Sequence, residues 1–133
     1  MIKFFGRNSA FSDYNNSAFF MNGSKMILID CPMSSFHKIR RMDLSEVEAI
    51  DILVTHTHAD HINGIAMLID LLWFTRGLSI TVITPNDAVK EDIRFALERL
   101  DGVGADWYKL TTVDEEKPAY VKAAIPTTHT EQR

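Results

Sequence analysis

The chain has 133 residues, of which 46% are hydrophobic and 24% charged, a composition typical of one globular domain. Its 14 basic and 18 acidic side chains give a net charge of -4, which argues against extended nucleic-acid binding, although Lys38, Arg40 and Arg41 form a local basic patch. The single cysteine excludes an intrachain disulfide, and the lack of a signal peptide or a long apolar stretch predicts a cytoplasmic protein outside the membrane.

The first part of the chain is predicted to form strands followed by a short helix. We expect a strand at 2–5 and a hairpin of strands 18–21 and 26–29, because the turn Asn22-Gly23-Ser24 between them tolerates positive φ. A short helix is expected at 34–41, with the serine at its start as the cap. The early strands should pair in antiparallel fashion.

Two longer helices and three strands are predicted to follow. One helix should span 63–76 and end at Gly77, since glycine readily adopts the left-handed conformation that closes helices. A second should open after Pro85 and run to Leu100. The expected strands are 79–84, 107–110 and 120–125. The expected buried face of the first helix consists of Ile65, Leu68, Ile69, Leu72 and Trp73. The second helix is indicated by residues at helical spacing: Asp87, Val89, Ile93, Leu97 and Leu100.

Three of the five histidines and one carboxylate lie together at 56–61. An apolar run leads into this cluster and an amphipathic segment leads out, which predicts a strand-to-helix loop. In extended backbone His56 and His58 point the same way and can hold one ion together, while Asp60 and His61 follow where the chain turns into a helix. Imidazole and carboxylate are ligands of zinc, and less often of manganese or iron, so we expect one or two such ions.

The pattern His-x-His-x-Asp-His, preceded by an apolar strand and followed by Ile-Asn-Gly-Ile, resembles the signature of the metallo-β-lactamase superfamily. Residues 26–30 resemble the earlier strand of that family, which ends in an aspartate, and residues 125–129 resemble its later strand, which ends in a third histidine. The resemblance implies an α+β fold of the αββα sandwich type, with helices on one face of a mixed sheet. It implies metal ligation by His56, His58 and His129 at a first ion and by Asp60 and His61 at a second, with Asp30 orienting a ligand.

The likeness extends from the first hairpin to His129, whereas enzymes of the superfamily continue into a second half that supplies a bridging aspartate and a further histidine. We therefore expect residues 1–133 to form a single metallo-β-lactamase-like domain that is incomplete at its C-terminus. The sheet face that would pack on the second half would then need cover. A homodimer is one arrangement that would provide it.

The expected activity is hydrolysis, because zinc held by imidazoles lowers the pKa of a bound water to about 7. The resemblance makes Asp60 catalytic, as the residue that orients the resulting hydroxide. The segment Ile-Leu-Ile-Asp-Cys-Pro resembles ribonuclease Z and small phosphodiesterases, which favours a phosphodiester substrate. Alternatives are hydrolysis of a thioester, a lactone or a β-lactam, or an inactive metal-binding half-domain that acts through oligomerisation or a partner chain.

Two other residues with reactive side chains are expected to be structural. His37 is predicted to lie on the exposed face of the short helix, and Cys31 to be a small buried apolar residue. A closed structural zinc site is disfavoured, because such sites are rich in cysteine and this chain has one.

Overall fold

A six-stranded mixed sheet organises the residues that the computed structural model describes, 1–9 and 11–127. The strands are β1 (Lys3–Gly6), β2 (Ser17–Asn22), β3 (Lys25–Ile29), β4 (Ala49–Leu53), β5 (Ile80–Thr84) and β6 (Tyr108–Thr112), and they neighbour one another in chain order. The first three strands pair in antiparallel fashion, and β3 to β6 are parallel. Parallel neighbours need a crossover connection. Each crossover here contains at least one helix.

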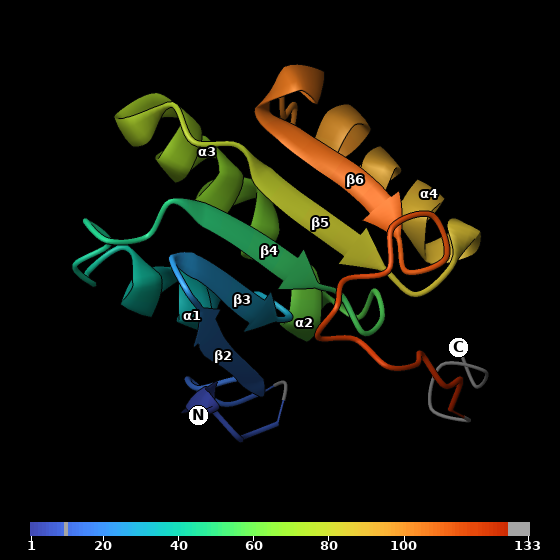
Figure 1. Cartoon of the computed structure of the whole chain (residues 1–133), viewed down its shortest axis with the longest axis horizontal. Helices are drawn as coiled ribbons and strands as arrows, with labels where there is room; N and C mark the ends of the chain where they lie inside the picture. Colours follow the sequence, from blue (N-terminus) through green and yellow to red (C-terminus); the bar gives the residue numbers. More distant parts are fainter. Residues whose placement is uncertain (10, 128–133) are drawn as a thin grey trace.

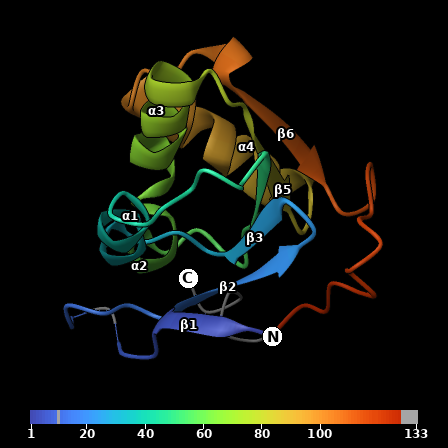
Figure 2. The ribbon, with the colours of Figure 1, turned by 60° about the vertical axis from the view of Figure 1, so that its left-hand side comes forward.

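The helices are α1 (Met33–Ile39), α2 (Ala59–Ile62), α3 (Ile65–Arg76) and α4 (Asp87–Arg94), with a π-helical turn at Phe95–Leu100 and a 3-10 turn at Ala105–Trp107. They lie on one face of the sheet (Figure 1). The turned view shows the segment after β6 running along the other side (Figure 2). The predicted α+β class with helices on one face of a mixed sheet is therefore confirmed. No described helix is long and apolar enough to cross a membrane.

The core lies between the sheet and the helices, as the side-chain alternation of the central strands requires. Its strand residues, each at most 1% exposed, are Met26, Leu28, Ile50, Ile52, Ile80 and Val82. The predicted face of α3 packs against them through Ile65, Leu68, Ile69 and Leu72, whereas Trp73 is only half-buried. The predicted hairpin is also confirmed, with Asn22 paired to Lys25 across the turn and Gly23 at a φ of 63°.

The predicted helix at 63–76 begins differently from the expectation. A separate short helix, α2, forms at Ala59–Ile62, and α3 starts after Gly64. Gly64 lies between the two helices, and its backbone is so close to the loop after β3 that an added Cβ would stand 2.5 Å from the carbonyl oxygen of Pro32. Glycine permits this close approach at the point where the two helices meet.

Two other expectations, the start of the first helix and the last strand, were wrong, and one helix differs in form. Helix α1 begins at Met33 with Pro32 at the cap position, and the Ser34 hydroxyl instead accepts a hydrogen bond from the Asn15 amide. The helix after Asn86 continues to Leu100 as predicted, but its last part, Phe95–Leu100, is π-helical and Leu100 is 68% exposed. No strand forms at 120–125.

The segment predicted as the last strand lies on the face of the sheet that the helices do not cover, called the open face below (Figures 1 and 2). Side chains hold it there. The hydroxyl of Tyr120 donates to Oδ2 of Asp51, 2.6 Å away, and its ring packs edge-on against Phe20. Both edges of β4 are already paired within the sheet. This stretch therefore crosses the sheet face and does not extend the sheet.

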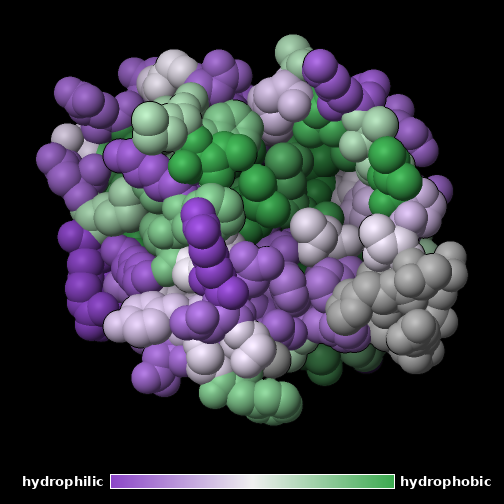
Figure 3. Space-filling model, turned by 90° about the horizontal axis from the view of Figure 1, so that it is seen from below, coloured by the Kyte–Doolittle hydropathy of each residue, from purple (hydrophilic) through white to green (hydrophobic). Residues whose placement is uncertain are grey.

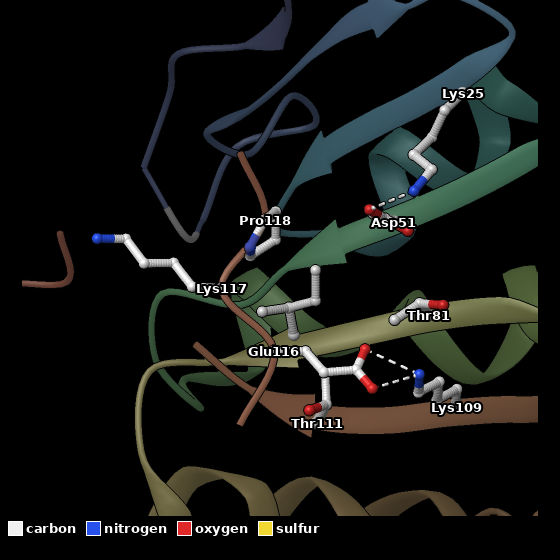
Figure 4. A pocket seen from close by; sticks show the side chains of 9 residues that line it. Lys25, Asp51, Thr81, Lys109, Thr111, Glu116, Lys117 and Pro118 are labelled. Carbon is white, nitrogen blue, oxygen red and sulfur yellow. Dashed lines mark hydrogen bonds and ion pairs between the residues drawn. The ribbon is translucent and has the colours of Figure 1, made fainter. Parts of the chain in front are cut away.

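The open face contains a polar hollow of about 330 Å³ next to this segment. Its lining includes two ion pairs, one between Lys25 and Asp51 at 3.3 Å and one between Lys109 and Glu116 at 2.6 Å (Figure 4). This part of the open face is thus polar. Apolar side chains are at the surface in the view from below, bordered by hydrophilic ones (Figure 3).

Gly77 ends α3 as predicted, and it offers a test of that assignment. Its φ is 62°, its amide donates to the Trp73 carbonyl, and nothing lies within 4 Å of an added Cβ. Gly77→Ala should therefore lower the free energy of unfolding by about 1 kcal/mol through backbone conformation alone. Gly77→Asn should cost less, because asparagine tolerates this region. Urea denaturation of the wild type and the two variants measures these differences. Equal stability of all three proteins would contradict the role of Gly77 as the left-handed residue that ends α3.

Candidate metal centre

The predicted site residues that lie within the described part of the chain gather at the carboxyl ends of β3 and β4. These strands are parallel neighbours with Ile29 opposite Leu53, so the residues that follow them leave the sheet at the same edge. Asp30 follows β3, and its amide donates to the Leu53 carbonyl at 2.9 Å. The histidine loop follows β4 and leads into α2, which carries Asp60 and His61.

Asp30 is the buried centre of this group. It is 3% exposed, and its carboxylate accepts three hydrogen bonds: from the Thr55 amide at 2.8 Å, from the Thr55 hydroxyl at 2.7 Å and from Nδ1 of His61 at 2.7 Å. Among the described non-glycine residues only Asp30 has a positive φ, 59°. Such backbone is uncommon outside glycine, and aspartate is among the residues that tolerate it. The conformation turns the carboxylate toward the neighbouring loop.

The nitrogen and oxygen donors of the cluster form two pairs. Nε2 of His56 lies 3.0 Å from Nδ1 of His58, and Nε2 of His61 lies 3.4 Å from Oδ2 of Asp60. Two donors bound to one tetrahedral zinc stand about 3.3 Å apart. Each pair thus has the spacing of two ligands of one ion, and the rings of His56 and His61 lie side by side with centroids 4.2 Å apart.

No three His, Cys, Asp or Glu side chains in residues 1–9 and 11–127 are arranged to hold a single ion. The pairs fit the donor chemistry of zinc, but each supplies only two ligands. The predicted ligand His129 lies outside the described residues. The structure therefore brings together His56 with His58 and Asp60 with His61, and it places Asp30 against His61.

Backbone and side-chain hydrogen bonds fasten α2 to the loop after β3. The Cys31 amide donates to the His61 carbonyl at 2.9 Å, the Gly64 amide to the Cys31 carbonyl at 2.8 Å, and the Met33 amide to Oδ1 of Asn63 at 2.7 Å. These contacts set the distance between Asp30 and His61. Sequence reasoning missed Asn63, because no local pattern shows which loop its side chain reaches.

Charge and burial affect the two ionisable neighbours of Asp30 differently. The hydrogen bond to Asp30 raises the pKa of His61 above its usual value, with burial opposing it. Burial, together with the nearby Asp30 charge, raises the pKa of the Cys31 thiol to about 12. Cys31 is thus buried, as predicted, and its thiol stays protonated at neutral pH. His37 is exposed on α1, also as predicted.

The family model described as "Anti-Pycsar protein Apyc1" matches residues 1–114 of the 133. The chain belongs to this family. It is 28% identical over 123 residues to the anti-Pycsar protein Apyc1 of Paenibacillus xerothermodurans, which covers 86% of this chain and 49% of that protein. It is 42% identical over 95 residues to the Apyc1 of Bacillus phage BSP38, which covers 67% of this chain and 36% of the phage protein.

The fold is also similar to a solved structure, the metallo-β-lactamase fold protein YhfI from Bacillus subtilis. The TM-score is 0.68 at 14% sequence identity, over 91% of this chain and 48% of that one. The predicted metallo-β-lactamase fold is therefore confirmed, whereas the comparisons do not support the narrower ribonuclease Z placement. The chain spans about half the length, or less, of the Apyc1 proteins compared here.

Proposed function

We propose that this chain carries the metal-binding part of a hydrolase that cleaves a phosphodiester. The observation that supports this most directly is the presence of two donor pairs, His56 with His58 and Asp60 with His61, at one edge of the sheet. Such density of ligand-type side chains around a buried carboxylate has little structural use. Zinc is the ion that this donor set favours, with manganese or iron as alternatives.

When bound, such an ion supplies Lewis acidity and lowers the pKa of a water to about 7. The residues of the chain would have separate tasks. His56 and His58 would hold a first ion through the two nitrogens that face each other. His61 and Asp60 would contribute to a second, and Asp60 would also orient the attacking water. Asp30 would keep the His61 ring in position through its hydrogen bond to Nδ1.

The name of the relatives supports one class of substrate. The anti-Pycsar name of the family favours a cyclic nucleotide as the phosphodiester. Such a substrate is small and needs no broad basic surface, which agrees with the net charge of -4. Thioesters, lactones and β-lactams are other substrates that the same metal chemistry could hydrolyse.

Each pair supplies only two ligands, so further ligands for each ion would come from other residues. His129 is one source, and a second copy of the chain or a longer polypeptide is another, because the relatives are about twice as long or longer. In this proposal residues 1–133 form one domain that is completed by further residues, and a homodimer would cover the open sheet face. The alternative is a half-domain that binds metal without turnover and acts through association.

The experiment measures turnover and stoichiometry on the same sample. Native mass spectrometry of the purified chain with added zinc counts copies and ions, and hydrolysis of bis-p-nitrophenyl phosphate and of cyclic nucleotides is followed in parallel. We expect turnover with zinc or manganese that disappears when a chelator removes the metal and returns when the metal is restored. A chain that binds zinc but turns over no phosphodiester would support the half-domain, and a chain that binds no metal would contradict both readings.

A further inference from the structure

We propose that Thr55 is a positioning residue that sets the tautomer of His56, so that Nε2 of this ring keeps the lone pair that metal binding needs. The inference rests on the proposed function, because the role concerns the same metal. Thr55 was not among the residues expected from the sequence. Its contacts in the structure identify it.

The Thr55 hydroxyl lies between a carboxylate and an imidazole. Its oxygen is 2.7 Å from Oδ2 of Asp30 and 2.9 Å from Nδ1 of His56. A hydroxyl has one proton to donate, and an ionised carboxylate only accepts. The proton is therefore directed to Asp30, and the short contact on the other side requires Nδ1 of His56 to donate. A neutral imidazole protonated at Nδ1 has its lone pair on Nε2.

Nε2 is the nitrogen of His56 that faces His58, the other member of the first pair. Nε2 of His56 lies 3.0 Å from Nδ1 of His58. Asp30 acts on His61 in the same way. It accepts a hydrogen bond from Nδ1, which leaves the lone pair of the ring on Nε2, the nitrogen that faces Asp60. One buried carboxylate thus orients two imidazoles, one directly and one through Thr55. Metal-binding histidines commonly have such a partner at the second nitrogen, and its loss typically lowers metal affinity about 10- to 100-fold.

The position allows the hydroxyl to be removed without damage to the core. Thr55 is exposed, and its backbone amide keeps its own hydrogen bond to Oδ1 of Asp30 whatever the side chain. Thr55→Val replaces the hydroxyl by a methyl group of similar shape, and Thr55→Ser retains the hydroxyl. Thr57 is a matched control two residues further along the same loop, where no side-chain hydrogen bond occurs within the described residues.

The first measurement is made on the metal-free chain. Long-range ¹H–¹⁵N correlation spectra of histidine-labelled protein report the tautomer of each ring at about pH 8, above the ordinary imidazole pKa of about 6.5. The His56 signals are assigned by their loss in His56→Gln. We expect protonation at Nδ1 in the wild type, in Thr55→Ser and in Thr57→Val, and a shift toward protonation at Nε2 in Thr55→Val.

The second measurement is zinc affinity by competition with a chelator. Thr55→Val should bind about tenfold more weakly than the wild type, while Thr55→Ser and Thr57→Val should stay within about twofold. An unchanged His56 tautomer in Thr55→Val would overturn the inference, and so would an equal loss of affinity in Thr55→Ser. The two proposals fail separately: a wild type that binds no zinc overturns the proposed function, whereas the tautomer is read without metal.

Discussion

His58→Ala is expected to weaken zinc binding by more than about 100-fold, since loss of a direct ligand should exceed the roughly 10- to 100-fold cost of losing a partner behind one. Nδ1 of His58 is one of the two nitrogens that face each other at 3.0 Å, so the substitution leaves His56 as the single donor of its pair. Phosphodiester turnover should fall with the affinity. Competition with a chelator and the bis-p-nitrophenyl phosphate assay measure the two effects on one preparation.

His37→Ala is the matched control, because His37 is exposed on α1 and its ring contacts Phe36 rather than the cluster. This variant should bind zinc within about twofold of the wild type. Unfolding curves of both variants show whether the fold is kept, since half-buried His58 lies outside the apolar core. Equal losses of affinity in the two variants would contradict the assignment of the site.

Gly64→Ala is expected to lower the free energy of unfolding more than replacement of a glycine in open space. Its Cβ would meet the carbonyl oxygen of Pro32 at 2.5 Å and that of Cys31 at 2.8 Å, both in backbone that cannot rotate away. Forcing an atom into packed structure costs about 1–3 kcal/mol, and more where backbone must move. We expect about 3 kcal/mol in urea denaturation, with weaker zinc binding, because the displaced loop carries Asp30.

Gly102→Ala separates this steric effect from the general cost of replacing glycine. Gly102 has a φ of 68° and nothing within 4 Å of an added Cβ. Its replacement should cost about 1 kcal/mol through backbone conformation and leave zinc affinity unchanged. If Gly64→Ala were no more destabilising than Gly102→Ala, the close approach to the loop after β3 would not be what requires glycine at position 64.

The features predicted correctly are those in which neighbours in the sequence are also neighbours in space. The hairpin at Asn22-Gly23-Ser24 follows from turn chemistry, and the buried face of α3 follows from helical periodicity. The pair His56 and His58 follows from the two-residue repeat of extended chain. Each rests on backbone geometry within a few residues, which needs no knowledge of the rest of the fold.

The incorrect predictions concern segments whose conformation depends on distant partners. Residues 120–125 have the composition of a strand, but Tyr120 is held across the sheet by Asp51 and Phe20, at sequence separations that no local pattern reports. The close approach of Gly64 to Pro32, beside the break before α3, likewise joins segments that are distant in the sequence.

By itself the sequence determined the grouping of three histidines and one carboxylate at 56–61, the hairpin and the class of the fold, because residue spacing and side-chain periodicity are local properties of a chain. The tertiary structure alone decided how Asp30 serves the cluster. Parallel pairing of β3 with β4 brings Asp30 beside Thr55, and α2 returns His61 to the same carboxylate. These hydrogen bonds join residues 25 and 31 positions apart, and only packing of the whole sheet and its helices makes them neighbours.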